Sequence, residues 1–489
     1  MMRSMYSGVA GLKVHQTKMD VIGNNIANVN TVGFKASNVN FSDVLYQTTQ
    51  SASGASEDTG LTGRNAKQIG IGAQVSSITT TVKTTGGTQR TDNALDCMIS
   101  GEAFFIVNQG GTNYFTKAGS FNVDSLGTLC TASGAAVMGW QVNAEGTDIN
   151  RDTVSKLNVM SPENMNTPPE ATTEAYVTGN VDASDTQLGS DEGVAMQVNF
   201  FDNLGKSYNL KLAMKETGTT GQYAITVTDI VDSDGKSLLS KTVPAEEGTS
   251  ESIAATDIEF SFGGVTYKPE LDENTDEVVL KGEGAATLTF DPATGAFKAV
   301  LAKEATTTTD GTEENKALTL TFTAGTGIDA FKPLNVDFST ITQYAGSGKC
   351  SLESQRGKAD GTGEGAGRTM GEMIGLSVDG SGKIFGSYDN GTSKLLGQIA
   401  VTTFANATGL EAVGDSLFAV TQNSGDFDGI GKDITETGGS LMTGVLEMSN
   451  VDLANEFTQM ITTQRGFQAN SRIITTSDTL LEELVNLKR

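Results

Sequence analysis

The sequence predicts a mostly β protein with long terminal α-helices. The two end helices are expected to form a coiled-coil-like pair, and the β-rich domains lie between them, the middle one inserted. Apolar residues recur every seven positions near both ends of the 489-residue chain, as in helices that pack side by side. Between the ends, apolar and polar residues alternate as in half-buried strands. The 58 glycines exceed the usual share, which suits many short strands joined by tight turns.

The N-terminal helix is expected within residues 1–35. One apolar column is spaced by seven and a second begins beside it; together they hold Met5, Leu12, Met19, Ile22 and Ile26. The stretch GNNIANVNTVGFK follows at 23–35. Asn28, Asn30 and Gly33 in this stretch can end a helix, because Asn and Gly tolerate the left-handed conformation of a C-cap.

The C-terminal helix is expected within residues 447–489. Its apolar stripe contains Leu453, Phe457, Met460, Phe467, Ile474 and Leu481. Ser449, Asn450 and Asp452 are candidate caps at its start, since their side chains can accept bonds from the first free amides. The spacing fits both coiled-coil-like packing and an ordinary amphipathic helix on a globular core. Two such helices leave apolar surface open, and neighbouring copies of the chain are the natural place to bury it.

The residues between the helices divide into three kinds of segment. Residues 36–89 are rich in Ser, Thr, Gly and Gln, which indicates an extended connector with little core. Residues 90–161 and 335–446 are expected to meet as one discontinuous β domain. Residues 162–334 begin with a polar stretch that holds three of the seven prolines, and they are expected to form an inserted outer β domain.

A turn signature, Asp followed three residues later by Gly, recurs between the expected strands. The Asp side chain can bond to the backbone that follows it, and Gly takes the positive-φ position of a short hairpin loop. These motifs are interpreted as turns rather than sites. They span residues 124–127, 202–205, 232–235 and 379–382.

Charge and hydropathy exclude several functions. The formal net charge is −26, so the basic footprint of a nucleic-acid binder is missing and adsorption to an anionic membrane is disfavoured. No run approaches the eighteen or so apolar residues of a membrane-spanning helix, and membrane insertion is not expected. The first residues also lack the apolar core of a secretory signal. The chain is therefore expected to be cytoplasmic, or exported by a route that cleaves no signal.

The cysteines and the lone histidine offer little chemistry. Cys97, Cys130 and Cys350 lie far apart without CxxC spacing, so neither a disulfide framework nor a zinc site is expected. Cys97 lies in an apolar run, which suits a small buried side chain. His15 falls on the inner side of the N-terminal helix, where packing explains it better than catalysis or metal binding.

Two short patterns superficially resemble ligand sites. GTGEGA at 361–366 lacks the preceding strand and following helix of a dinucleotide site, and a loop fits better. In DENTDEVVLKGE at 272–283 the candidate calcium ligands are Asp272, Asn274, Asp276 and Glu283. Glu277 occupies the position where a calcium loop needs Gly, so an acidic hairpin is the better interpretation. No catalytic residue, metal site or cofactor is therefore expected, and the chain is not expected to be an enzyme.

Both ends of the sequence resemble one family. GLKVHQTKMDVIGNNIANVNTVGFK and SNVDLANEFTQMITTQRGFQANSRIITTSDTLLEEL are similar to the N- and C-terminal signatures of the flagellar rod and hook family of axial proteins. ALDCMISGEAFFIV and YFTKAGSFNVDSLGTL resemble its β domain. Cys97 and the stretch 345–375 depart from the family pattern. The motif residues carried by the N-terminal signature are Gly23, Asn24, Asn25, Ala27, Asn28, Asn30, Gly33 and Phe34.

The resemblance implies a structural subunit that polymerises. The wording of the C-terminal signature and the separate middle domain favour the hook members, which form a curved, flexible tube that transmits torque from motor and rod to filament. The alternatives are a distal rod or hook-associated protein and, from another class, a secreted β-rich hydrolase or adhesin. The implied partners are further copies of the chain, rod and hook–filament junction proteins, the hook cap, and export chaperones and apparatus. The implied location is the flagellum outside the cell, reached by flagellar type III export without a cleaved signal.

Overall fold

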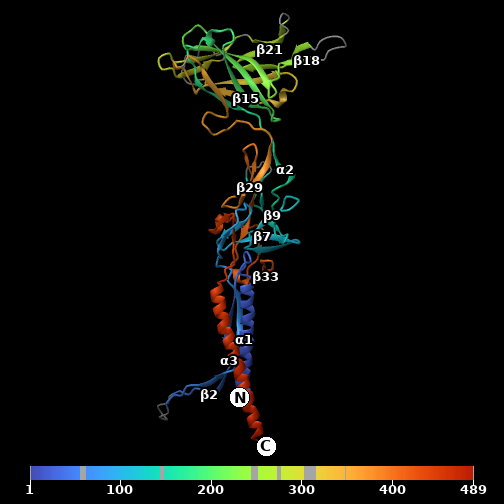
Figure 1. The fold of residues 1–489 in the computed structure, drawn as a ribbon, viewed down its shortest axis with the longest axis vertical. Helices are drawn as coiled ribbons and strands as arrows, with labels where there is room; N and C mark the ends of the chain where they lie inside the picture. Colours follow the sequence, from blue (N-terminus) through green and yellow to red (C-terminus); the bar gives the residue numbers. More distant parts are fainter. Residues whose placement is uncertain are drawn as a thin grey trace. The chain divides into compact units, whose positions relative to one another are not determined.

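The computed structural model describes residues 2–54, 62–143, 148–243, 252–272, 277–282, 284–301, 315–346 and 348–487. The chain divides into two compact units (Figure 1). Unit 1 comprises Met1–Met165, Met373–Ser387 and Ser393–Arg489, and unit 2 comprises Asn166–Glu372 and Tyr388–Thr392. The predicted fold class, mostly β with a long helix at each end, is confirmed.

The two long helices of unit 1 run antiparallel and pack against each other. Helix α1 spans Met2–Ala27 and α3 spans Leu453–Asn486. Asp452 caps α3, because its side chain accepts bonds from the amides of Ala454, at 2.9 Å, and Asn455, at 3.3 Å. The cap satisfies amides that the helix leaves free at its start.

Residues 36–89 form paired strands that also belong to unit 1. Strand β1 (Ser37–Asp43) pairs with β4 (Ala73–Thr80), and β2 (Tyr46–Gln50) pairs with β3 (Lys67–Gly70), both antiparallel. Strands β1 and β4 contact α1. None of the residues of β1, β2 and β3 is fully buried, so this segment relies on α1 and on backbone pairing. The short strand β5 (Thr88–Arg90) pairs with β36 (Val445–Glu447).

The main sheet of unit 1 joins two distant parts of the sequence. Its strands follow the order β30-β31-β11-β7-β8-β34-β33, so strands on both sides of the middle segment share one core. That core includes Phe105, Phe121 and Ile399 on one face and Phe104 and Trp140 on the other. The strands of this part are β6 (Cys97–Ser100), β7 (Phe104–Gln109), β8 (Thr112–Thr116), β9 (Phe121–Val123), β10 (Leu129–Thr131), β11 (Ala136–Gln141), β12 (Ser155–Lys156), β29 (Gly371–Val378), β30 (Lys383–Tyr388), β31 (Ser393–Ile399), β32 (Val401–Thr402), β33 (Glu411–Gly414), β34 (Leu417–Ala419) and β35 (Ser440–Thr443).

Unit 2 contains two larger sheets that share a core. One has the order β15-β16-β17-β23-β24, and the other β22-β21-β20-β25-β26-β14-β27 with β28 paired to β14. Residues of both sheets, such as Leu210 and Phe260, lie in one buried cluster. The elements are β13 (Asn166–Thr167), β14 (Glu174–Asn180), β15 (Val194–Phe201), β16 (Ser207–Glu216), β17 (Gln222–Asp232), β18 (Ser240–Val243), β19 (Ser252–Ala255), β20 (Glu259–Phe262), β21 (Val265–Asp272), β22 (Glu277–Gly282), β23 (Ala286–Phe290), β24 (Phe297–Leu301), β25 (Ala317–Ala324), β26 (Leu334–Asp337), β27 (Ile341–Thr342) and β28 (Ser351–Arg356). The short helix α2 (Pro162–Met165) lies at the end of a unit 1 segment.

Unit 2 reaches further along the chain than the sequence suggested. Residues 335–372, which the sequence analysis grouped with the flanking β domain, lie in unit 2. Strand β14 explains the difference. It pairs in parallel with β26 and β27 and antiparallel with β28, so these later strands complete the sheet that β14 begins. The glycine-rich loop at 361–366 joins β28 to β29, and the loop interpretation of GTGEGA is confirmed.

The expected Asp-to-Gly turns are confirmed. In the first of them, Oδ1 of Asp124 accepts bonds from the amides of Leu126, at 3.0 Å, and Thr128, at 2.7 Å. Gly127 has φ of +81°, a conformation that disfavours a side chain. The turns beginning at Asp202, Asp232 and Asp379 repeat this pattern of two amides on one carboxylate oxygen.

The candidate calcium loop coincides with a hairpin. Strands β21 and β22 pair antiparallel, with Asp272 opposite Glu277, while Asn274, Asp276 and Glu283 lie outside the described residues. Within the described ranges, no three His, Cys, Asp or Glu residues gather as a metal site would require. Across the same ranges, no helix is both long and apolar enough to cross a membrane.

Candidate assembly site

The closest points of the interface between α1 and α3 involve small and polar residues. A Cβ added at Gly11 would lie 2.6 Å from Nδ2 of Asn470, and one added at Gly466 would lie 2.7 Å from the ring of His15. The helices therefore approach too closely for larger side chains at these points. On α3, a column spaced by seven faces this contact, and its members are polar: Glu456, Thr463, Asn470 and Ser477.

Two side-chain hydrogen bonds mark the ends of this interface. Oγ of Ser4 and Oγ of Ser477 lie 3.4 Å apart. Near the other end of the pair, Nδ2 of Asn25 donates to Oε1 of Glu456 at 3.2 Å. Burial raises the pKa of the Glu456 carboxyl, and the bond from Asn25 and the charge of Lys18 oppose this rise. The second carboxyl oxygen of Glu456 is buried and has no hydrogen-bond partner among the residues that the structure describes.

The predicted apolar columns lie at different depths. Ile22 is buried, and the other predicted residues of α1 are partly buried. On α3, the predicted column from Met460 to Leu481 is also partly buried. Leu453 and Phe457 are 39% and 49% exposed, so α1 does not cover them. In the single chain, most of the predicted residues are thus partly or fully buried, whereas these two lie at the surface.

Much of the apolar surface of the helices remains open. Tyr6 on α1 is 62% exposed, and Ile461 on α3 is 59% exposed. Besides these two and the Leu453 and Phe457 already described, the exposed large apolar residues of the two helices are Met2, Val9, Ile473, Leu480, Leu484 and Val485. The amphipathic pattern is therefore inverted in part: a polar column lies in the contact within the chain beside a partly buried apolar column, and other large apolar residues face outward. Such outward surface is typical of an interface with another molecule.

The asparagine-rich motif closes α1 by side-chain bonds. Nδ2 of Asn28 donates to the carbonyl and to Oδ1 of Asn24, at 2.9 and 3.1 Å. Asn28 and Asn30 do not adopt positive φ, so the expected left-handed Asn cap is not formed. Gly33 does have φ of +69°, but it lies beyond the end of the helix.

The Asn25 side chain forms hydrogen bonds with the chain segment that follows α1. Its amide donates to the carbonyl of Ser37 at 2.9 Å and its Oδ1 accepts from the Ser37 amide at 3.0 Å. The Gly33 amide donates to the carbonyl of Glu447 at 2.8 Å. A Cβ at Gly33 would lie 2.7 Å from the Ala118 nitrogen, so a glycine lets this turn approach the β domain. The N-terminal and C-terminal motifs therefore meet here, and we call the region around Gly33, Lys35 and Glu447 the junction.

A buried ion pair lies at the centre of the junction. Nζ of Lys35 and Oε1 of Glu447 are 2.6 Å apart, and their side chains are 1% and 0% exposed. The buried Lys117 lies nearby, and Nζ of Lys117 donates to the Gly101 carbonyl at 2.8 Å. Burial lowers the pKa of Lys117 to about 8; the charge of Glu447 opposes this, and the charge of Lys35 adds to it.

Lys35 and Glu447 were not predicted as functional residues, and the predicted helix-cap role of Asn450 is wrong. Asn450 was considered a helix cap, but its Oδ1 accepts from the Ala36 amide at 2.8 Å and its Nδ2 donates to the Thr81 carbonyl at 2.9 Å. It therefore ties the C-terminal motif to the segment after α1. Lys35 is the last residue of the motif GNNIANVNTVGFK. Its place in the motif could have indicated a role, but a single Lys does not reveal a partner as distant as Glu447.

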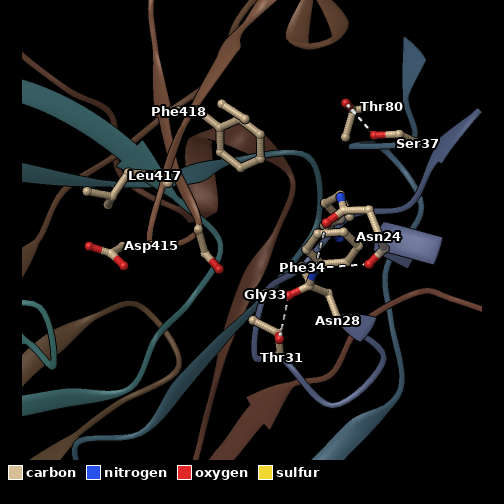
Figure 2. A pocket seen from close by; sticks show the side chains of 14 residues that line it. Asn24, Asn28, Thr31, Gly33, Phe34, Ser37, Thr80, Asp415, Leu417 and Phe418 are labelled. Carbon is tan, nitrogen blue, oxygen red and sulfur yellow. Dashed lines mark hydrogen bonds between the residues drawn. The ribbon is translucent and has the colours of Figure 1, made fainter. Parts of the chain in front are cut away.

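A hollow of about 410 Å³ opens beside the junction. It lies at the end of α1 and is lined by residues from 24–37, by Thr80 and by the turn region 412–418. Figure 2 shows Leu417 and Phe418 on one side and Asn24, Asn28 and Phe34 on the other. Its lining combines aromatic and aliphatic surface with amide and hydroxyl groups.

The tight turn at Asp415 and Ser416 forms one wall of this hollow. Asp415 and Ser416 have φ of +50° and +57°, as the two central residues of a tight hairpin turn require. Oγ of Ser416 donates to the Val32 carbonyl at 3.2 Å, and the Ser416 carbonyl accepts from Thr116 at 2.9 Å. The turn between β33 and β34 is therefore fixed to the N-terminal motif.

Four protein-family profiles match this chain. They describe the "Flagella basal body rod protein" at residues 5–35, the "Flagellar hook protein FlgE/F/G D1 domain" at 98–176, the "Flagellar basal body protein FlaE D2 domain" at 167–357 and the "Flagellar basal body rod FlgEFG protein C-terminal" at 442–487. The two terminal matches coincide with the helices and the junction described above.

Curated relatives match over the whole chain. The flagellar hook protein FlgE of Treponema pallidum is 34% identical over 507 residues, and that of Borreliella burgdorferi is 36% identical over 518 residues; each match covers 100% of both chains. The flagellar basal-body rod protein FlgG of Bacillus subtilis is 28% identical over 489 residues, again covering 100% of both. A crystal structure of the Helicobacter pylori flagellar hook protein FlgE2 aligns with a TM-score of 0.35 and 13% identity, over 74% of this chain and 100% of that one.

Proposed function

This chain belongs to the flagellar hook protein family, and from that premise we propose how it serves as a structural subunit of the bacterial flagellar hook. It self-assembles into a curved, flexible tube that transmits torque from the motor and rod to the filament. The terminal helices of many copies form the inner layer of the tube. The β domains form the outer layers.

One observation supports the proposal that the helices pack against neighbouring copies. Large apolar residues such as Tyr6 and Ile461 face outward, while polar residues such as Glu456 and Thr463 are buried within the single chain. Burying a large apolar side chain contributes roughly 1.5–3 kcal/mol. Contacts between copies would therefore stabilise the helices more than the contact that one chain makes by itself. Neighbouring copies are the partner that a helical polymer supplies.

The β units suit the outer layers of such a tube. The net charge of −26 fits a solvated exterior. Bending requires neighbouring subunits to slide at outer radius, and polar contacts between β units permit this better than a continuous apolar interface. The Lys35–Glu447 junction then transmits force between the helices and the β sheet of the same copy, because both end motifs bond to it.

The location is the bacterial flagellum. We infer that the chain reaches the cell exterior through the flagellar type III apparatus without a cleaved signal, assisted by export chaperones. Its three cysteines, far apart in sequence, suit a chain that passes unfolded through a narrow channel. The further partners are rod proteins, hook–filament junction proteins and the hook cap. The function proposed is mechanical and involves no catalysis.

Electron microscopy of polymer grown from the purified chain tests this function. A hook subunit should form curved tubes that bend without breaking. Straight, rigid tubes would indicate a distal rod or another axial protein instead. A chain that stays monomeric under all polymerising conditions would contradict a structural role and reopen the possibility of an adhesin or a hydrolase.

A further inference from the structure

Helix α3 continues past the start of α1. Ser4 lies beside Ser477, and the helices run antiparallel, so the first residue of α1, Met2, lies near the level of Leu480. Helix α3 continues to Asn486, about 10 Å further at 1.5 Å per residue. Figure 1 shows α3 extending beyond the N-terminal end of α1. We call residues 480–487 the projection.

Four apolar residues of the projection are exposed within the described part of the chain, and they lie beside the acidic Glu482 and Glu483. Leu480 is 47% exposed, Leu484 49%, Val485 67% and Leu487 83%. Leu484 continues the seven-residue column of Asn470 and Ser477, which contacts α1 at Gly11 and Ser4. The projection therefore presents the same helix face that α1 covers elsewhere, but without α1.

The hollow of about 410 Å³ lies at the opposite end of the same helix pair. Phe34, Leu417 and Phe418 give it apolar walls. Asn24 and Thr80 add polar side chains at its lining, and these can donate hydrogen bonds. The last carbonyls of a helix lack intrahelical donors, so the end of α3 needs both kinds of contact that the hollow offers.

We propose that the projection of one copy occupies the hollow of a second copy, so that copies join head to tail. This inference rests on the proposed function and specifies which surfaces meet along the polymer. A contact between two different surfaces is heterologous, and a heterologous contact that does not close on itself generates an open helical polymer. The projection and the hollow lie at opposite ends of one helix pair, which is the arrangement that such a chain of contacts requires.

Neighbouring positions on one edge strand provide the first test. Ala412 lines the hollow, whereas Val413, which lies at a register shift of the β33–β34 pairing and is 56% exposed, does not line it. Ala412→Phe should fill the hollow and raise the critical concentration for polymerisation about tenfold or more, as expected when one leucine-sized side chain is no longer buried. The matched control Val413→Phe should polymerise like the wild type. Equal behaviour of the two variants, with unchanged folding by circular dichroism, would overturn the proposal.

Crosslinking identifies the contact directly. In full-length chains carrying Cys130→Ser and Cys350→Ser, one batch carries Leu484→Cys and is mixed with a second batch carrying Ala412→Cys, Val413→Cys or Val9→Cys. After polymerisation and mild oxidation, linked pairs should form with Ala412→Cys and much less with Val413→Cys. Links to Val9→Cys, which lies on the outer face of α1, would show that the projection packs along a neighbouring helix and would overturn the proposal.

The outcomes separate this inference from the function on which it rests. Polymer that forms in every mixture but gives no link from Leu484→Cys to Ala412→Cys would contradict the head-to-tail contact and leave the structural role intact. A wild-type chain that forms no polymer would contradict the proposed function and the inference with it.

Discussion

Lys35 and Glu447, which are 412 residues apart in sequence, form an ion pair of 2.6 Å that is almost completely buried. Nζ of Lys35 also donates to the Thr84 carbonyl at 2.8 Å, and Oε1 of Glu447 accepts from the Gly86 amide at 2.9 Å. The N-terminal motif, the segment after β4 and the C-terminal motif therefore meet at one carboxylate. This pair fixes the point where the helices join the β domain.

Removing one member of this pair should destabilise unit 1. Glu447→Gln leaves the Lys35 ammonium buried without its counter-charge, at a cost of about 3–5 kcal/mol. The double variant Lys35→Met with Glu447→Met should cost less, because no charge stays buried. Trp140 is the only tryptophan and lies in the core of unit 1, so its fluorescence during denaturant unfolding reports the change.

The exposed pair of Lys83 and Glu102, at 3.2 Å, provides the control. Glu102→Gln should change the free energy of unfolding by no more than about 1 kcal/mol, as is typical of surface pairs. A cost for Glu447→Gln that is as small as that of Glu102→Gln would show that the junction does not depend on the buried pair.

The lowered pKa of Lys117 predicts that unit 1 becomes more stable as the pH rises into the alkaline range. Burial lowers its pKa to about 8 in the folded chain, below the ordinary value of a lysine. Between about pH 8 and pH 10 the unfolded chain then holds a proton that the folded chain has lost. The free energy of unfolding should therefore increase with pH across this window, by up to about 1.4 kcal/mol per pH unit. Trp140 fluorescence at several pH values measures this slope.

Lys117→Met isolates the contribution of this side chain. The variant cannot titrate at this position, so it should lack the extra slope, whereas other groups contribute equally to both proteins. Parallel pH profiles for the wild type and Lys117→Met would contradict the lowered pKa.

The extent of unit 2 predicts which fragment folds alone. A fragment of residues 166–372 contains β14 with its partners β26, β27 and β28, and it should melt cooperatively by circular dichroism. A fragment of residues 162–334, the boundary suggested by the sequence, ends before most of β26 and lacks β27 and β28. It should be much less stable. Similar melting of both fragments would show that the later strands are dispensable.

The thiols should differ in reactivity. Cys97 is completely buried, and burial together with the nearby Asp96 raises its pKa to about 12. Burial also raises the pKa of the partly exposed Cys130 and Cys350 thiols. We expect Cys97 of the native chain to resist alkylation at pH 8, because the thiolate is the reactive form, and all three cysteines to react after unfolding. Mass spectrometry that finds a native disulfide, or a readily labelled Cys97, would contradict this.

Periodicity was sufficient to predict the helices, because the seven-residue columns depend only on local sequence. The same columns did not reveal which neighbour each residue contacts. Phe457 shares the predicted stripe with Met460, yet α1 leaves it exposed. The polar column of Glu456 and Thr463 was not expected to be buried, since close approach at glycines such as Gly466 is a property of the assembled pair.

Contacts between residues far apart in sequence could not be predicted. The strands at 334–342 alternate as those of either unit do, and only their bonds to β14 assign them to unit 2. The burial of Lys35 depends on Glu447, a partner that no local pattern identifies. The Asp-to-Gly turns could be predicted because all of their bonds lie within five residues.

The variant Ile461→Asp tests whether neighbouring copies bury the outward apolar face of the helices. Ile461 is 59% exposed in the single chain, so the change should leave the melting of unit 1, followed by Trp140, as in the wild type. It should abolish polymer in a sedimentation assay, because burying an unpaired charge between copies is costly. Thr458→Asp, the same charge at an exposed polar position of α3, should still polymerise. If Ile461→Asp sediments as the wild type does, the outward apolar face of the helices is not an interface between copies.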